Sequence, residues 1–424
     1  MKLVKKIRCI LLLLPAITGQ AQVQSFTIEQ CYELAKQNYP LLKKHELIAR
    51  TADYSIDNAG KVYLPQFSIS GQASYQSKTI NFADVLGSLP GISAPALSKD
   101  QYRVQAAISQ QIYDGGATRS QRDIIRANAA VREQKLETDL YALKERITQL
   151  YFSILLMYEQ LQQNEIKKAN LQSAADKAEA ARRNGTAFKS AVDELRAEVA
   201  GAELVNIEFR ANWKAYLQML FIFIGKPFNE MVKLQEPAQQ LLDTVIKRPE
   251  LALFSFQKKV FEAEEKQLQS GYLPKLSAFV QGDYGRPTLN IIDNKFGPWW
   301  LGGLRLNWEL GSLYTLKNNR ALLKNNRGDL DIDQETFVYN TRLMLSRQNS
   351  ETEKYADMVR QDDAIIAFRA AVTKAAQAQL DNGVITVHEY ISKLDAENLA
   401  RQAKILHNTQ LLLAQYTYKN TSGN

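Results

Sequence analysis

The side chains best suited to acid–base or metal chemistry are few and scattered in this sequence. Its three histidines are His45, His388 and His407, and none stands in an HExxH arrangement or another metal-ligand spacing. There is no GxSxG nucleophile motif, no phosphate-binding Walker loop and no GxGxxG turn after a strand. His388-Glu389 is a bare dipeptide of the kind found on ordinary helix surfaces. We therefore expect no enzyme activity, no catalytic residue, no metal site and no cofactor.

The sulfur-containing side chains do not form a soft-metal site either. Beyond position 21 the only cysteine is Cys31, which we interpret as a small buried apolar residue on the first helix. The remaining methionines are scattered along predicted helices and are typical of core filler, so dedicated copper or silver export is not supported. They are Met157, Met219, Met231, Met344 and Met358.

The first 21 residues have the pattern of a secretory signal peptide. Four basic residues precede the apolar stretch Ile10 to Leu14, and Gly19-Gln20-Ala21 gives a small-residue cleavage pattern. Removing those four positive charges from the formal net charge of +8 leaves +4. This small excess is spread along the chain without interleaved aromatic residues, which argues against nucleic-acid binding. No later apolar run approaches the ~20 residues of a transmembrane helix.

Matching residues recur in the same order in both halves of the sequence. Pro40 and Pro65 correspond to Pro249 and Pro274 at an offset of 209, and Tyr63-Leu64-Pro65 repeats at the same offset as Tyr272-Leu273-Pro274. Later pairs, such as Arg183-Asn184-Gly185 with Asp381-Asn382-Gly383, stand 196 to 198 apart. Ordered matches along the whole chain indicate an internal duplication.

The duplication predicts two structural repeats, 22–224 and 247–424, joined by a linker at 225–246. Each repeat reads as a helix, two strands, a very long helix, a tight break and another helix. A capping box of Thr27 and Gln30 opens the first repeat. Its elements are a helix from Thr27 to about Gly60, strands 64–76 and 101–113, and helices 117–183 and 189–224. The second repeat has a helix near 250–270, strands 273–284 and 299–310, and helices 313–381 and 385–418.

The long helices need partners along their length, because a helix of about 67 residues would extend for ~100 Å. Apolar residues recur every seven positions in both, which is typical of left-handed coiled coils. One set is Leu136, Leu143, Leu150 and Met157, with Leu140, Ile147, Ile154 and Leu161 four positions later. The other is Leu316, Leu323, Leu330, Phe337, Met344, Met358, Ile365 and Val372, interrupted by Glu351.

The four strands alternate between an apolar face and a polar face. In 64–76, Phe67, Ile69 and Tyr75 share one face, and the other face is uncharged but wholly polar. In 299–310, Trp300, Leu304, Leu306, Trp308 and Leu310 oppose a face with Arg305 and Glu309, which is tolerable in a bilayer only where that face lines water. Strands of about ten residues have the length of tilted membrane strands. Aromatic residues near the strand ends are candidates for a membrane girdle: Tyr63, Tyr75, Tyr113, Trp299, Trp300 and Trp308.

Four strands cannot close a membrane barrel, since the smallest barrels have about eight. An open sheet edge in lipid is also forbidden by its unpaired backbone groups. Several copies of the chain are therefore expected to contribute strands to one barrel, with the polar faces toward its lumen. A soluble four-stranded sheet packed on the helices is the alternative structure.

In these features the chain resembles the TolC-like outer membrane efflux family over nearly its whole length, from about 27 to 418. The resemblance is carried by the start Phe26-Thr27-Ile28-Glu29-Gln30, the doubled Tyr-Leu-Pro strand openings and Tyr113-Asp114-Gly115-Gly116. It is also carried by the Asn-Gly breaks, which precede Leu195-Arg196-Ala197-Glu198 and Leu394-Asp395-Ala396-Glu397. Each motif alone is weak, and their order and duplication are specific.

The resemblance implies a mainly helical chain with β-strands that assembles as a homotrimer. Antiparallel coiled-coil helices would form a periplasmic tunnel below a twelve-stranded barrel in the outer membrane of a Gram-negative cell, and the 225–246 linker would join an equatorial belt. The protein would act as a passive exit duct in tripartite efflux or type I secretion. Its partners would be a periplasmic adaptor, an inner-membrane pump of RND or ABC type, and outer-membrane lipid.

The resemblance also implies roles for residues at the helix breaks. The turns with Asn184, Gly185, Thr186 and with Asn382, Gly383, Val384 would lie together at the periplasmic tip and meet the adaptor. Acidic residues after the second break would ring a pore constriction and raise one another's pKa. Glu389 occupies the first acidic position, Ser392 departs from the family at the second, and Asp193 is a further candidate. Turn geometry alone equally explains the glycines, and a solvated helix surface equally explains Glu389 and Asp193.

A secreted coiled-coil scaffold or adhesin without a channel is the alternative function. The duplicated helices suit it, whereas the alternating strands with aromatic ends do not. Drug efflux, metal efflux and protein secretion all stay open as the exported cargo, as do the particular pump and adaptor and the resting state of the pore.

Overall fold

The computed structural model describes residues 25–80, 97–290 and 294–424. The predicted signal peptide, 1–21, lies outside the described residues. The chain divides into two compact units that cut across the predicted repeats. One unit holds the described residues up to Asn38 together with 146–239 and 354–413, and the other holds 39–145, 240–353 and 414–424.

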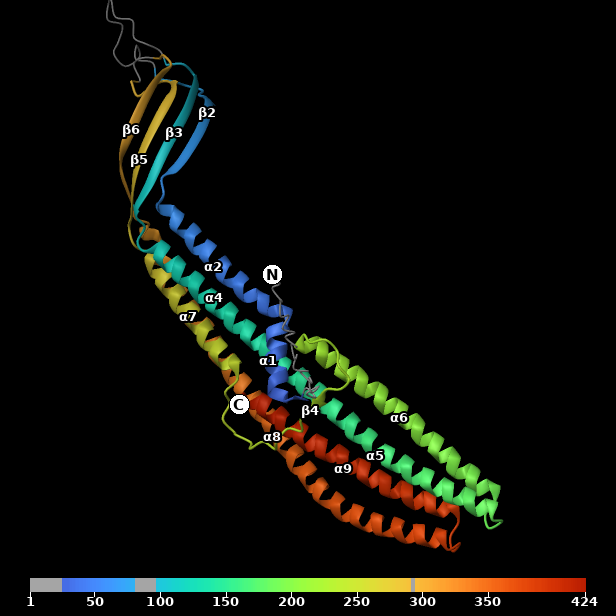
Figure 1. The fold of residues 1–424 in the computed structure, drawn as a ribbon. Coiled ribbons are helices and arrows are strands. Elements are labelled where there is room, and N and C mark those ends of the chain that lie inside the picture. Colours follow the sequence, from blue (N-terminus) through green and yellow to red (C-terminus); the bar gives the residue numbers. More distant parts are fainter. Residues whose placement is uncertain (1–24, 81–96, 291–293) are drawn as a thin grey trace, which may run out of the picture. The chain divides into compact units, whose positions relative to one another are not determined.

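The second of these units contains a four-stranded antiparallel sheet. Its strands are β2 (Gln66–Tyr75), β3 (Asp100–Tyr113), β5 (Lys275–Arg286) and β6 (Gly297–Asn307). Their order is β2-β3-β5-β6, so the hairpin of each repeat lies beside that of the other (Figure 1). The strand predicted at 299–310 was too long, because the backbone turns after Asn307 into the 3-10 turn η3 (Leu310–Ser312). Trp308, Glu309 and Leu310 therefore lie outside β6.

Four helices accompany the sheet in this unit: α2 (Lys44–Gly60), α4 (Ala117–Tyr141), α7 (Pro249–Ser270) and the first part of α8 (Leu313–Asp381). Helix α4 packs between α2 and α7, as Figure 1 shows. It begins directly after β3, where the carboxylate of Asp114 accepts hydrogen bonds from the amides of Gly116, at 2.9 Å, and Thr118, at 2.7 Å. These bonds satisfy helix-end donors that would otherwise lack partners.

Two of the long predicted helices are interrupted in the structure. The helix expected from Thr27 to Gly60 is α1 (Ile28–Asn38), the 3-10 turn η1 (Pro40–Lys43) and α2. Pro40 is the reason: it has no amide hydrogen, and it holds the preceding Tyr39 in an extended conformation with ψ of 126°. The helix expected at 117–183 is α4 and α5 (Leu143–Arg183), separated by Ala142 alone.

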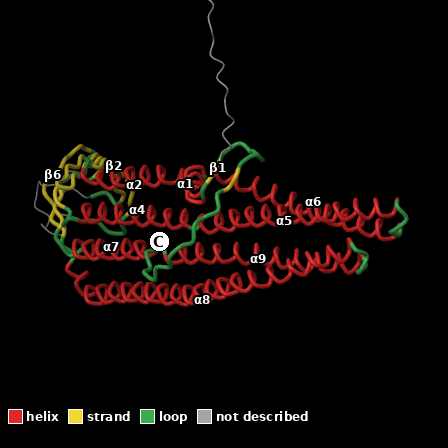
Figure 2. Tube along the Cα trace, turned by 60° about the horizontal axis from the view of Figure 1, so that its bottom comes forward, coloured by secondary structure: helices red, strands yellow, loops and turns green. Residues whose placement is uncertain are grey.

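The other unit is built from α1, α5, α6 (Lys189–Ile224), the second part of α8 and most of α9 (Val387–Ser422). Figure 2 shows α5 beside α6 and α8 beside α9, each pair forming an antiparallel hairpin. A short parallel pair, β1 (Ser25–Phe26) with β4 (Lys233–Leu234), lies against α5. The hydroxyl of Tyr151 joins them by donating to the carbonyl oxygens of Phe26, at 2.9 Å, and Gln235, at 2.6 Å.

The capping box at the start of α1 is confirmed. The Thr27 amide donates to Gln30 Oε1 at 3.0 Å, and the Gln30 amide donates to Thr27 Oγ1 at 3.2 Å. Cys31, one turn further on, is fully buried, and this burial, aided by the charge of Glu29, raises the pKa of its thiol to about 12. Its predicted role as a buried apolar residue is likewise confirmed.

The two predicted heptad sets differ in burial. In α4 and α5 the seam is buried at Leu136, Leu140, Leu143, Ile147, Ile154 and Leu161. In α8 only Leu330 of the predicted seam is buried, and Met344, Ile365 and Val372 are exposed. The chain thus covers the first seam itself and leaves much of the second uncovered. Among the helices of the described ranges, none combines the length and apolar character that a membrane span requires.

Candidate functional site

The strand register sorts the sheet's side chains into two faces of contrasting chemistry. Directly paired residues share a face, and successive residues alternate. Phe67 pairs with Ile108, which pairs with Val280, so one row of the apolar face crosses three strands. A row of the opposite face crosses all four strands and is polar at three positions, as Ser70 pairs with Gln105, Gln105 with Asp283, and Asp283 with Trp299.

The apolar face is exposed, although soluble sheets bury such faces. Ile69 is 82% exposed and Trp300 is 75% exposed. Phe67, Val104, Val280, Leu304 and Leu306 are exposed as well. A contiguous exposed apolar surface of this kind marks contact with lipid or with another protein. Two charged residues share the face, Asp100 and Arg286, and they form an ion pair with each other.

Aromatic side chains lie at both ends of the strands. Tyr63, Tyr113 and Trp308 lie at the end from which the helices continue, and the Trp308 indole donates to the Tyr272 carbonyl oxygen at 3.1 Å. At the opposite end, Tyr75 is joined by aromatic residues that the sequence prediction missed. Phe296 stacks on Tyr102 and Tyr284, with ring centroids 6.1 and 6.2 Å apart.

One member of the predicted girdle lies on the wrong face. Trp299 and Trp300 are successive residues of β6, so they must point to opposite sides of the sheet. Trp300 is on the exposed apolar face with Ile69, whereas Trp299 pairs with Asp283 on the polar face. The alternation of residues 299–310 already indicated that Trp299 lies on the polar face. Its position near a strand end does not indicate a face.

A second candidate site is formed by the two turns at the ends of α5 and α8. Both helices end in the same motif: the Thr186 amide donates to Ala181 O at 2.9 Å, and the Val384 amide donates to Gln379 O at 2.8 Å. These bonds span five residues and require a left-handed residue just before the donor. Gly185, with φ of +77°, and Gly383, with φ of +70°, supply it. A Cβ on either glycine would meet no atom within 4 Å, so both turns are open.

The two turns lie together in one unit of the structure. Lys177 of α5 and Asp381 of α8 form an ion pair at 3.0 Å, and His388 Nδ1 lies 3.0 Å from the carboxylate of Glu194. Residues of both turns line a hollow of about 540 Å³. Phe188, just after the first turn, is 84% exposed, and Val384 of the second turn is also exposed. The two turns form the tip of the helical hairpins. This tip exposes apolar side chains beside glycines that no other atoms cover.

Glu389, predicted to line a constriction, has a local structural role. It completes a capping box with Thr386, in which the Thr386 amide donates to Glu389 Oε2 at 2.9 Å and the Glu389 amide donates to Thr386 Oγ1 at 3.2 Å. These hydrogen bonds from Thr386 hold the pKa of the Glu389 carboxyl below its usual range. Glu389, Asp193 and Ser392 are all exposed. The Thr-x-x-Glu spacing could have revealed the cap.

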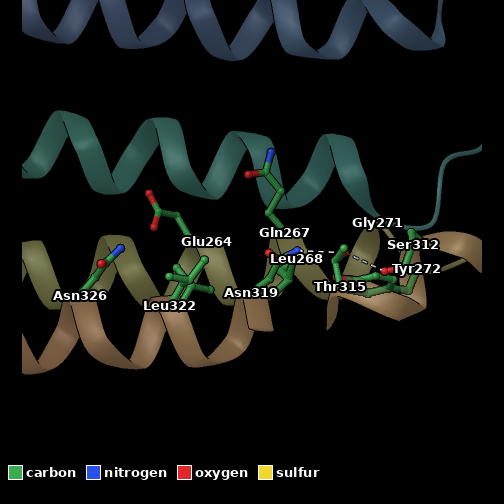
Figure 3. A pocket seen from close by; sticks show the side chains of 11 residues that line it. Glu264, Gln267, Leu268, Gly271, Tyr272, Ser312, Thr315, Asn319, Leu322 and Asn326 are labelled. Atoms are coloured by element: carbon green, nitrogen blue, oxygen red, sulfur yellow. Dashed lines mark hydrogen bonds between the residues drawn. The ribbon is translucent and has the colours of Figure 1, made fainter. Parts of the chain in front are cut away.

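A groove of about 550 Å³ lies between the end of α7 and the start of α8 (Figure 3). Glu264 is the one charged residue among those that line it, and amide, hydroxyl and aliphatic side chains supply the rest. The lining offers no base beside a nucleophile, so it does not form a catalytic constellation. Nor do the described residues include a cluster of three or more His, Cys, Asp or Glu side chains that could hold a metal ion.

Comparison with known proteins agrees with this geometry. Residues 31–226 match the model of the outer membrane efflux protein family. No curated protein matches the chain. Among solved structures, CusC superimposes with a TM-score of 0.67 at 14% identity, over 93% of this chain and 91% of that chain. VceC of Vibrio cholerae gives 0.64 at 11%, over 94% and 96%. The CmeC outer membrane channel of Campylobacter jejuni gives 0.64 at 13%, over 93% and 85%.

The fold is thus that of the TolC-like outer membrane channels, with antiparallel helical hairpins, a small antiparallel sheet and an internal duplication. The chain is similar to the outer membrane efflux protein family, whose model matches residues 31–226, most of the first repeat. This family match and the shared fold indicate an outer membrane location with a large periplasmic helical portion.

Proposed function

We propose that the protein is the passive outer-membrane exit duct of a tripartite efflux or type I secretion system. The observation that carries this proposal is the sheet, which has an exposed apolar face and a polar opposite face. Its outer strands, β2 and β6, each have one neighbour among the described strands. Such edges are forbidden in lipid unless another chain pairs with them.

Three copies would remove every edge by pairing β6 of one copy with β2 of the next. The result is a twelve-stranded barrel with the apolar faces toward lipid and the polar faces toward a water-filled lumen. The uncovered heptad seam of α8 supports the same assembly, because Met344, Ile365 and Val372 need a partner that their own chain does not supply. The helices of the three copies would then enclose a periplasmic tunnel.

The tip of the helical hairpins is the proposed docking site for a periplasmic adaptor, which would connect the duct to an inner-membrane pump. Its open backbone at Gly185 and Gly383 allows close approach of a partner helix, and exposed Phe188 and Val384 supply apolar contacts. Glu389 stays the first candidate for a charged constriction near this tip, with Asp193 second. Ser392 adds no charge at that position.

Conduction by the purified protein tests the proposed function. Full-length protein reconstituted in planar lipid bilayers should give long-lived conductance steps of uniform size, since a barrel closed by protein edges has a fixed diameter. Absence of conductance, together with release of the protein from membranes by alkaline carbonate without detergent, would instead support a coiled-coil scaffold. Heat-unfolded protein serves as the control for conductance caused by detergent or contaminants.

A further inference from the structure

The polar face of the sheet has a consistent excess of positive charge. Among the paired residues of the described strands it carries Arg103, Lys275 and Arg305 against a single carboxylate, Asp283, a net charge of +2 per chain. The apolar face carries one residue of each sign, Asp100 and Arg286, so it has no net charge. The asymmetry therefore belongs to the face that would line the lumen.

The one carboxylate is sequestered, whereas the cationic groups are accessible. The Asp283 side chain has no exposed surface, and the Arg103 side chain, whose Nε lies 4.0 Å from Asp283 Oδ1, is 53% exposed. A buried carboxylate is tolerated only beside an opposite charge. Arg103 supplies that charge from the adjacent strand, and Lys275 and Arg305 are both exposed to solvent. An ion passing this face meets positive charge first.

The arginines are held against the wall and do not extend freely into solvent. The Arg103 guanidinium lies 5.8 Å from the ring centre of Trp299, and that of Arg305 lies 4.7 Å from the ring centre of Phe279. Stacking on a ring fixes a guanidinium while leaving its charge unneutralised. Gly285, opposite Arg103, must stay a glycine because a Cβ there would lie 2.3 Å from the Tyr102 carbonyl oxygen. The backbones of β3 and β5 therefore approach closely beside Arg103.

We infer that the polar face of the sheet forms an anion-favouring wall of the conduit, in which Arg103 and Arg305 attract solutes bearing carboxylate, phosphate or sulfonate groups. The inference rests on the proposed function, because it needs the polar face to line a lumen. Three copies would place six stacked arginines around it. Electrostatic attraction by such a ring raises the local concentration of anions and weakens as salt rises.

Ion selectivity of single-charge variants tests the wall. In planar bilayers under a dilute KCl gradient, Arg103→Gln and Arg305→Gln should each lower the chloride-to-potassium permeability ratio by about fourfold or more. One unit charge about 10 Å from an ion in water changes the local concentration of chloride and of potassium about twofold in opposite directions, and each variant removes three such charges from the trimer. Asp283→Asn should raise the ratio by a similar factor, because it leaves Arg103 unopposed. All three shifts should shrink in concentrated salt. Arg286→Gln removes the same charge from the apolar face and is the matched control.

A second readout uses a multivalent anion. Citrate added to the compartment on the side of the bilayer opposite the helices should reduce the single-channel current of the unmodified protein. Arg305→Gln should weaken this block. Conducting channels whose permeability ratio and citrate block are the same in all variants, with their detergent mass unchanged, would overturn the anion-favouring wall and leave the conduit intact. Loss of conductance in the unmodified protein would overturn the proposed function itself.

Discussion

Glu389 caps α9 and also carries a charge, and the effect of that charge on ion permeability can be measured separately from the cap. Glutamine can still accept the Thr386 amide hydrogen bond of a capping box, so Glu389→Gln removes the charge and keeps the cap. We expect this variant to lower cation permeability in planar bilayers without loosening the start of α9. Glu389→Ala should lose the cap as well and increase proteolysis at the second turn. An unchanged ion selectivity in Glu389→Gln would assign the residue to the cap alone.

Glu179 predicts an acid-dependent stability of the first hairpin tip. Its carboxylate bonds first to Arg182 and also to Arg183, which lowers its pKa from 4.5 to about 2. Since the folded pKa is depressed, the stabilisation is complete above pH 4.5 and is lost as pH falls toward 2.

Limited pepsin digestion checks this prediction within one chain, with cleavage at the second turn as the internal reference. At pH 4, Glu179→Gln should be cut faster than the unmodified protein at the first turn, and the two should converge near pH 2, the folded pKa. Equal cleavage of both proteins at pH 4 would mean that the arginine cluster does not stabilise this tip.

At the scale of elements, a buried polar pair aligns α5 with α6. Asn164 Nδ2 donates to Asn206 Oδ1 at 2.7 Å and to the Ala202 carbonyl oxygen at 2.8 Å, and both asparagines are buried. Asn206 lies among the buried residues of α6, which include the apolar residues Leu195 and Ala202. Asn164→Ala leaves Asn206 Oδ1 buried without this donor, which should cost about 1–3 kcal/mol of stability.

Thermal unfolding followed by circular dichroism in detergent measures the effect. The double replacement Asn164→Leu and Asn206→Leu removes both polar groups and should recover stability while relaxing the alignment of the two helices. A double variant less stable than Asn164→Ala would show that packing at these positions, and not hydrogen bonding, dominates.

Substitutions at the two glycine turns can distinguish the effect of backbone strain from the effect of a blocked partner contact. Gly185→Ala and Gly383→Ala each place a Cβ on a left-handed residue but fill little space, whereas Gly185→Trp and Gly383→Trp add bulk to the same strain. We expect the tryptophan variants alone to abolish efflux in cells that depend on this channel, with conductance in bilayers preserved. Normal efflux in both tryptophan variants would contradict adaptor docking at this tip.

Sequence patterns predicted the elements best where local rules act. The Thr27–Gln30 cap and the apolar seam of α4 and α5 follow from spacing alone. The interruption at Pro40 was missed because the helical pattern continues on both sides of it. The face of Trp299 follows from the alternation within its own strand and was missed only because nearness to the strand end was used instead. The burial of Asp283 beside Arg103 depends on strand register, which is set by pairing between residues of different repeats. The sequence of one strand does not contain that information.

At the scale of the whole molecule, the chain carries surfaces that it cannot satisfy alone. The edges β2 and β6, the exposed apolar face of the sheet and the uncovered seam of α8 each require lipid or another copy. One assembly of identical chains accounts for all of these surfaces together.

The mass of the detergent-purified protein tests this account most directly. Light scattering that separates protein from bound detergent should give three times the mass of the mature protomer, which is somewhat below the 48.0 kDa of the full chain. The trimer should persist on dilution, because its strands have no other partners in a micelle. A stable monomer that conducts ions in planar bilayers would contradict the claim that three chains build the conduit.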